Sequence, residues 1–101
     1  MRFLVKVTPS VTRFNECVRE GTANARVQQI LDEIKPEAVY FYETGGRRTV
    51  LMVVEMEKTS QMPAIAEPWF LYFDAEVDFE PCMLPEDLAE AGLEELGRKY
   101  G

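Results

Sequence analysis

Two tyrosines, Tyr40 and Tyr42, are the side chains of this sequence best suited to chemistry on a small organic ligand. A phenol can donate a hydrogen bond to a bound carbonyl, or act as a proton donor when its pKa is lowered. Their spacing of two puts both on one face if the segment is a strand. Tyrosine is also a common filler of protein interfaces, and this structural role is the more usual one for such a pair.

Histidine is absent from the chain, and this limits the mechanisms open to it. The usual general base is missing, so Ser-His-Asp and Cys-His arrangements and histidine-ligated haem or zinc sites are excluded. Carboxylate, tyrosine, lysine or cysteine chemistry remains. Cys17 and Cys82 are isolated, and we interpret both as reduced packing residues. We therefore expect no metal site and no cofactor.

Lys6, with Arg2 beside it, is the candidate for holding an anionic ligand. Both fall on the first expected strand, next to acidic residues of the last expected strand. The more common role for such residues is a set of cross-strand ion pairs. We expect that pairing with Glu76, Asp78 and Glu80.

Trp69 and Glu67 form the third candidate position, on either side of Pro68. An aromatic side chain next to a proline kink can line a small pocket between helix and sheet. A buried Glu67 would have a raised pKa and could act as a base. The simpler interpretations are a core position for Trp69, and a capping or solvent-facing position for Glu67.

The length of 101 residues predicts a single domain, residues 1–101, large enough for its own core. Hydrophobic residues make up 47% of the chain and the net charge is −7. An acidic surface disfavours nucleic acid and anionic membranes as partners. No apolar stretch has the length of a membrane span, and the N-terminus has a charge within its apolar run. We therefore expect a cytoplasmic protein.

The hydrophobic periodicity predicts an alternation of strands and helices. Gly21-Thr22 interrupts the first helical segment, Ser60 is a suitable N-cap for the second, and Pro68 should kink or split that second helix. A final helix opens at Pro85 with acidic residues in its first turn. The expected strands are 2–8, 37–44, 47–56 and 75–82, and the expected helices are 11–35, 61–73 and a C-terminal extension over 85–101.

Gly45-Gly46 predicts a two-residue hairpin turn, and the turn fixes the register of the two middle strands. Thr44 then lies opposite Arg47, and Glu43 lies opposite Arg48 as a favourable charge pair. The whole order is the split βαβ pattern, a ferredoxin-like βαββαβ domain of α+β class. It implies an antiparallel four-stranded sheet of order 4-1-3-2 with both helices on one face.

Both faces of the expected sheet carry apolar side chains, whereas a face in contact with water should be mostly polar. One face is almost wholly apolar and should lie under the helices; it carries Phe3, Val5, Val7, Val39, Phe41, Val50, Met52, Val54, Ala75, Val77 and Phe79. The other is apolar and aromatic at its centre, with Leu4, Lys6, Tyr40, Tyr42, Thr49, Leu51 and Val53. A second copy of the chain is the simplest cover, so we expect a homodimer. The alternative is that the last helix folds back over its own sheet.

Several segments resemble the dimeric α/β-barrel (ferredoxin-like) superfamily and, more closely, an uncharacterised bacterial family of about this length. They are the N-terminal residues 1–7, Lys35-Pro36-Glu37-Ala38, Arg48-Thr49-Val50, residues 65–71 and Pro85-Glu86-Asp87-Leu88. The resemblance implies a barrel formed by two sheets packed face to face. The superfamily includes cofactor-free monooxygenases, isomerases, haem-degrading enzymes and ligand-binding domains. The haem-degrading branch depends on a histidine that this chain lacks.

Two ligand-based functions follow as hypotheses, beside a third in which the chain is a purely structural dimer or a subunit of a larger assembly. The sequence does not decide whether the protein is an enzyme. The first is a small-molecule-binding or interaction module with a small apolar or aromatic ligand. The alternative is a cofactor-independent monooxygenase- or isomerase-like enzyme on small aromatic or lactone substrates. In both, the candidate ligand-binding residues are Lys6, Tyr40, Tyr42, Glu67 and Trp69.

Overall fold

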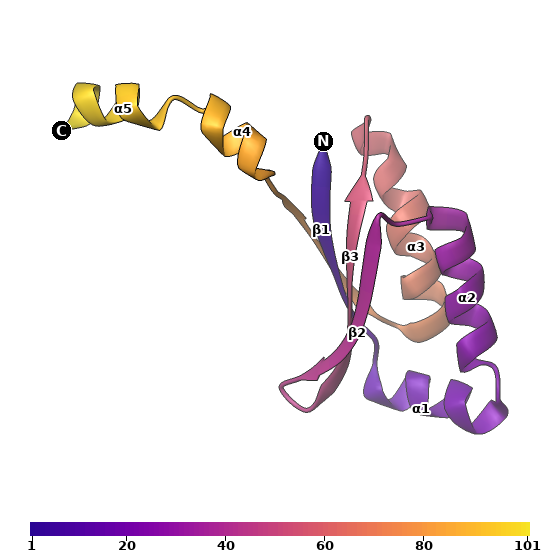
Figure 1. The fold of residues 1–101 in the computed structure, drawn as a ribbon. Helices are drawn as coiled ribbons and strands as arrows, with labels where there is room; N and C mark the ends of the chain where they lie inside the picture. Colours follow the sequence, from indigo (N-terminus) through magenta and orange to yellow (C-terminus); the bar gives the residue numbers. More distant parts are fainter.

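The computed structural model describes all residues 1–101 and has α+β architecture (Figure 1). Its strands are β1 (Arg2–Thr8), β2 (Ala38–Thr44), β3 (Arg47–Glu55) and β4 (Glu76–Pro81). Its α-helices are α1 (Val11–Glu20), α2 (Ala23–Ile34), α3 (Met62–Phe73), α4 (Pro85–Glu90) and α5 (Leu93–Tyr100), with a short 3₁₀ turn η1 (Thr59–Gln61) before α3.

The four strands form one open antiparallel sheet of order β2-β3-β1-β4, as the sequence predicts. The hairpin register is also confirmed, with Thr44 opposite Arg47 and Glu43 opposite Arg48. Gly45 and Gly46 both adopt positive φ (59° and 74°), which the tight turn requires and which glycine adopts without strain. This architecture is compatible with a ferredoxin-like fold.

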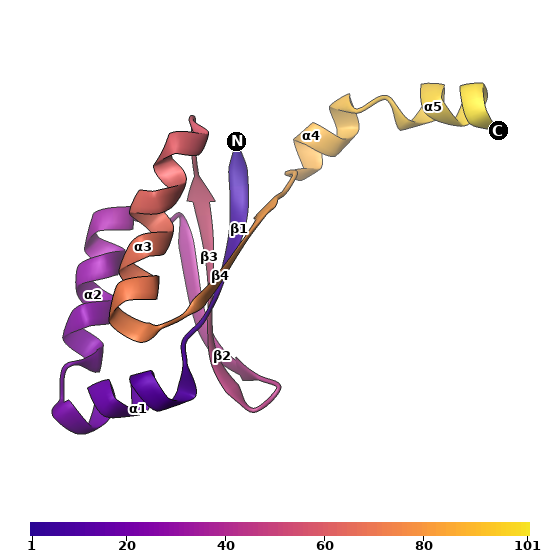
Figure 2. The same ribbon diagram turned by 180° about the vertical axis from the view of Figure 1, so that it is seen from behind.

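The first helical segment is two helices, because Gly21 adopts the left-handed backbone conformation (φ 76°) and ends α1 there. The Gly21 N–H bonds to the Val18 carbonyl at 3.1 Å and the Thr22 N–H to the Cys17 carbonyl at 2.9 Å, which closes α1. The interruption expected at Gly21-Thr22 is therefore confirmed. Helices α2 and α3 lie on one side of the sheet, and the other side carries no helix (Figure 2).

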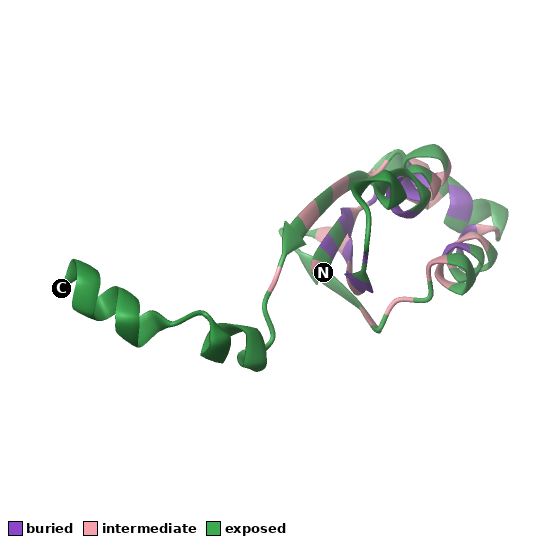
Figure 3. Ribbon diagram, turned by 90° about the horizontal axis from the view of Figure 1, so that it is seen from above, coloured by how far each residue is buried: buried purple, intermediate pink, exposed green.

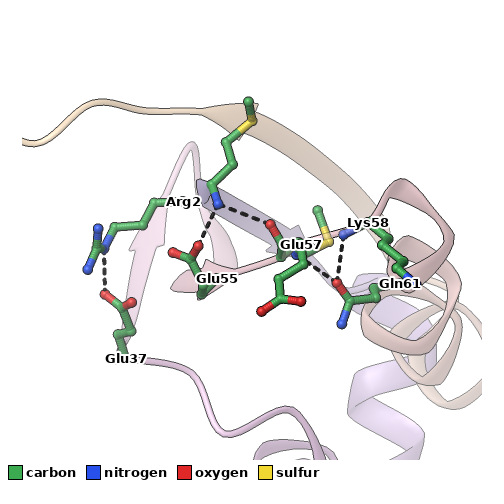
Figure 4. A network of polar contacts seen from close by, with 8 residues as sticks. Arg2, Glu37, Glu55, Glu57, Lys58 and Gln61 are labelled. Carbon is green, nitrogen blue, oxygen red and sulfur yellow. Dashed lines mark hydrogen bonds and ion pairs between the residues drawn. The ribbon is translucent and has the colours of Figure 1, made fainter. Parts of the chain in front are cut away.

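The start of α3 differs from the prediction that Ser60 caps it. No side chain caps α3; instead, Oε1 of Gln61 accepts from the backbone N–H groups of Glu57 (2.8 Å) and Lys58 (3.0 Å), which precede η1, and so closes that turn (Figure 4). Pro68 does not split the helix, since α3 is continuous through it.

The core lies between the helices and the inner side of the sheet. Val5, Val7 and Met52 are fully buried there, as the strand alternation predicts. Trp69 is also fully buried, with its ring 6.1 Å from that of Phe73, and its indole N–H has no hydrogen-bond partner. Of the apolar residues predicted for this side, only Phe41 lies outside the cover of the helices, with 59% of its surface exposed.

The C-terminal segment leaves the rest of the molecule after β4 (Figure 3). Helices α4 and α5, joined at Gly92 (φ 73°), have no buried residue. They lie away from the sheet and cover neither of its faces. The alternative in which the last helix folds back over its own sheet is therefore not what this structure shows, because the chain runs straight outward from β4. We call residues 85–101 the arm.

Removal of the Trp69 side chain should destabilise the protein strongly. We expect Trp69→Ala to lower the free energy of unfolding by about 3–5 kcal/mol, because it leaves a large cavity. Trp69→Phe should cost much less, since it keeps an aromatic ring and removes a buried N–H without a partner. Phe70→Ala, at an exposed neighbour, is the control. Chemical denaturation measures all three, and a mild effect of Trp69→Ala would contradict the core role.

Candidate functional site

The outer face of the sheet, which the helices leave uncovered, is the first candidate surface. Tyr40 is 62% exposed, Tyr42 39% and Leu4 36%, while Leu51 and Val53 are half-buried. Leu51 lies directly opposite both Tyr40 on β2 and Lys6 on β1. The predicted side chains are thus on one apolar and aromatic surface, which we call the tyrosine face.

Thr49 is the one buried residue of the tyrosine face, with 2% of its surface exposed in a single chain. Its hydroxyl donates to the Arg47 carbonyl at 3.3 Å. Arg47, on the same side of β3 by strand alternation, donates from Nη2 to the Pro9 carbonyl at 2.9 Å. The end of this face next to the hairpin is therefore closed within one chain.

The expected cross-strand ion pairs of Arg2 and Lys6 with β4 do not form. Arg2 donates from Nε to Glu37 at 2.9 Å, at the approach to β2 (Figure 4). This hydrogen bond and the charge of Glu37 raise the pKa of Arg2. Lys6 lies opposite Asp78, but no carboxylate comes within 4 Å of its ammonium group. Long exposed side chains gain little from such a pair, and here they remain apart.

The remaining predicted ligand residues lie elsewhere. Trp69 is inside the core, and Glu67 faces solvent on α3, where it borders a shallow hollow with Gln29, Pro63 and Tyr72. The structure therefore brings Lys6, Tyr40 and Tyr42 to one surface but separates them from Glu67 and Trp69.

A cleft of about 300 Å³ lies where the hairpin meets α1 and α2. Phe14, Val27, Phe41 and Val50 supply its apolar lining, and Arg48 and Glu43 supply its charges. Phe14, Val27 and Phe41 also line a neighbouring hollow of about 510 Å³, which extends along α2 to Leu31. The two spaces follow from the uncovered β2 edge, where Phe41 projects beyond the helices. Of the candidate residues predicted from sequence, only Tyr42 borders this cleft.

Arg48 is the charged group of the cleft that has no ionic partner. Its guanidinium carbon lies 4.7 Å from the centre of the Phe14 ring, a cation–π contact. The predicted pairing with Glu43 is right in register but wrong as an ion pair, since no carboxylate lies within 4 Å of Arg48. The cleft thus presents a cation over an aromatic ring and a carboxylate that is free to accept a hydrogen bond.

An aromatic residue on the helix side of an edge strand, Phe41, is the signal in the sequence that could have located this cleft. Strand alternation puts Phe41 on the helix side, yet one helix pair cannot cover the full width of a four-stranded sheet. An edge-strand aromatic on the helix side therefore marks a potential hollow. The contact of Arg48 with Phe14 joins residues 34 positions apart, and no local pattern shows it.

Other classes of site find no support in the geometry. No group of three or more Cys, Asp or Glu side chains comes together in a way that could hold a metal ion. None of the helices combines the length and the apolar character needed to cross a bilayer. A comparison with models of known protein families gives no match, and neither does a sequence comparison with characterised proteins.

The neighbouring arginines Arg47 and Arg48 should respond differently to substitution. Arg47→Ala removes the hydrogen bond that ties the hairpin to Pro9, and we expect a loss of about 1–2 kcal/mol of stability. Arg48→Gln removes only the cation–π contact with Phe14, and we expect the free energy of unfolding to fall by less than about 1 kcal/mol. Thermal and urea unfolding measure both. An equal loss for the two variants would show that Arg48 also has a structural role.

Proposed function

We propose that this chain is a homodimeric small-molecule-binding module of the dimeric α/β-barrel kind. The observation that carries the binding function is the apolar cleft with the unpaired guanidinium of Arg48. Ligand sites in proteins are concave and mostly apolar, with a few polar groups that orient the ligand. The volume of the cleft is at the lower end of the usual range, so the ligand should be small.

The chemistry of the lining indicates a small aromatic or apolar carboxylate as the ligand. A carboxylate can accept two parallel hydrogen bonds from a guanidinium, and Arg48 has no competing carboxylate within 4 Å. An aromatic ring can pack against Phe14 and Phe41. Glu43 can accept a hydrogen bond from a hydroxyl or amine elsewhere on the ligand.

The tyrosine face supports the homodimer. It exposes Leu4, Tyr40 and Tyr42 around half-buried Leu51 and Val53, whereas the outer face of a solvated sheet is normally polar. Two copies packed face to face would enclose these side chains between two sheets. The two free cysteines fit a reducing compartment, so we propose a cytoplasmic location.

The binding proposal is tested by a thermal-shift screen of small aromatic carboxylates, followed by calorimetry of any hit. We expect Arg48→Gln to weaken binding roughly ten- to a hundredfold, because it removes a charge-assisted hydrogen bond. Arg19→Gln makes the same change of charge at an exposed site of α1 and should leave binding unchanged. Equal affinity of the wild type and Arg48→Gln would contradict the site. Chemical conversion of a bound compound to a product would indicate the alternative, a cofactor-independent enzyme.

The dimer is tested by sedimentation or light scattering across a range of concentrations. We expect the wild type to be a dimer, and Tyr40→Ser to weaken it by at least tenfold, since it removes a large apolar contact at an exposed position. Leu71→Ser is the matched control, because Leu71 is 76% exposed on the helix side of the molecule. A monomeric wild type would refute the dimer without bearing on the ligand cleft.

A further inference from the structure

The arm has an apolar side that touches nothing in its own chain. Leu88 is 44% exposed, Leu93 58%, Leu96 46% and Tyr100 77%. Leu93, Leu96 and Tyr100 recur at spacings of three and four, so they share one side of α5. The opposite side carries Glu94, Glu95 and Arg98, with an exposed ion pair between the last two. This is the pattern of a helix that packs against another surface.

Length also indicates that the arm needs a partner surface. Helices α4 and α5 have six and eight residues, whereas isolated helices shorter than about 12–15 residues are marginal in water. Local groups do shape them: Asp87 accepts from the Leu84 N–H at 2.8 Å, and Pro85 opens α4. Capping of this kind defines where a helix begins, but stability must come from packing.

The direction of the arm identifies the partner. In Figures 1 and 2, α2 and α3 lie on one side of the sheet and the arm extends to the opposite side. That side is the space in front of the tyrosine face. A second copy packed on the tyrosine face would occupy this space, so the arm would run along its flank.

The area of the tyrosine face also indicates a second copy of the chain as the partner of the arm. Four strands about 4.8 Å apart, paired over about six residues, give the sheet a flat footprint of only about 400 Å². Each partner in a stable protein interface buries about 800 Å². Accessible area exceeds flat area on a side-chain surface, so the tyrosine face is at most of the usual interface size, and two exchanged arms would enlarge the contact.

We propose that the arm of each copy docks on the flank of a second copy and completes the interface that the tyrosine faces begin. This proposal rests on the homodimer proposed above. At the end of the sheet where β2 begins, a hollow of about 250 Å³ is lined by Ile34, Val54, Ala64 and Ile65. These apolar side chains offer a receiving surface for the apolar side of α5.

Charge selects the relative orientation of the two copies. The β4 side chains Glu76, Asp78 and Glu80 are exposed on the tyrosine face and have no ionic partner. A two-fold axis across the strands would set β4 against β4 and bring these like charges together, which is costly. An axis along the strands sets β4 against β2 of the other copy. The carboxylates then meet Tyr40 and Tyr42, whose hydroxyl groups can donate to them.

This orientation places the arm beyond the β2 edge of the other copy, at the end of the sheet where β2 begins. Lys35 lies there, directly after α2 and before β2. Lys99 is the only lysine of the arm. The two ammonium groups thus report whether the arm of one copy reaches the flank of another.

The test is amine-reactive cross-linking of a mixture of ¹⁴N- and ¹⁵N-labelled full-length protein, refolded together and analysed by mass spectrometry. We expect mixed-isotope cross-links from Lys99 to the body of the other copy, mainly to Lys35. Leu93→Ser combined with Leu96→Ser should abolish them and weaken the dimer by roughly tenfold or more. Glu94→Ser combined with Arg98→Ser, which keeps the net charge, should change neither result.

Two results would overturn the proposal, and they differ in what else they overturn. Same-isotope cross-links only, or none from Lys99, in a protein that is still a dimer would refute arm exchange and leave the dimer standing. A protein that is monomeric at all concentrations would refute both. Neither result bears on ligand binding by Arg48, which is measured separately.

Discussion

The structure depends on a sheet that is apolar on both sides, because a strand places successive side chains on opposite faces. On the inner side, Val5, Val7 and Met52 are fully buried beneath the helices. The same strands carry Leu4, Leu51 and Val53 on the outer side, where no element of the chain covers them. The helices cover the inner face only, so the outer face remains exposed in a single copy of the chain.

The width of the sheet adds a second consequence at the β2 edge. Two helices packed on four strands leave an edge strand partly bare, and here Phe41 is the residue left out. Because Phe41 is exposed, the hairpin, α1 and α2 enclose a cleft rather than a continuous core. Arg47 fixes the hairpin to Pro9, which holds Arg48 in position over Phe14 without a carboxylate partner. One arginine thus has a structural contact while its neighbour remains available to a ligand.

Local chemistry made most of the fold predictable. Gly45-Gly46 fixed the hairpin register, Gly21 marked the break between α1 and α2, and strand alternation sorted the core residues. The errors concern contacts between residues distant in sequence. Arg2 pairs with Glu37 rather than β4, and Arg48 lies on Phe14 rather than Glu43. Long charged side chains have several partners within reach, and these differ too little in free energy for spacing alone to select one.

The site was harder to predict than the fold for a related reason. Tyr40 and Tyr42 were placed correctly on one face, because that placement follows from strand periodicity. The cleft depends on how far the helices extend across the sheet, and hydrophobic periodicity holds no information on that distance. The direction of the arm has the same origin: its helices are locally encoded, but their position relative to the sheet is not.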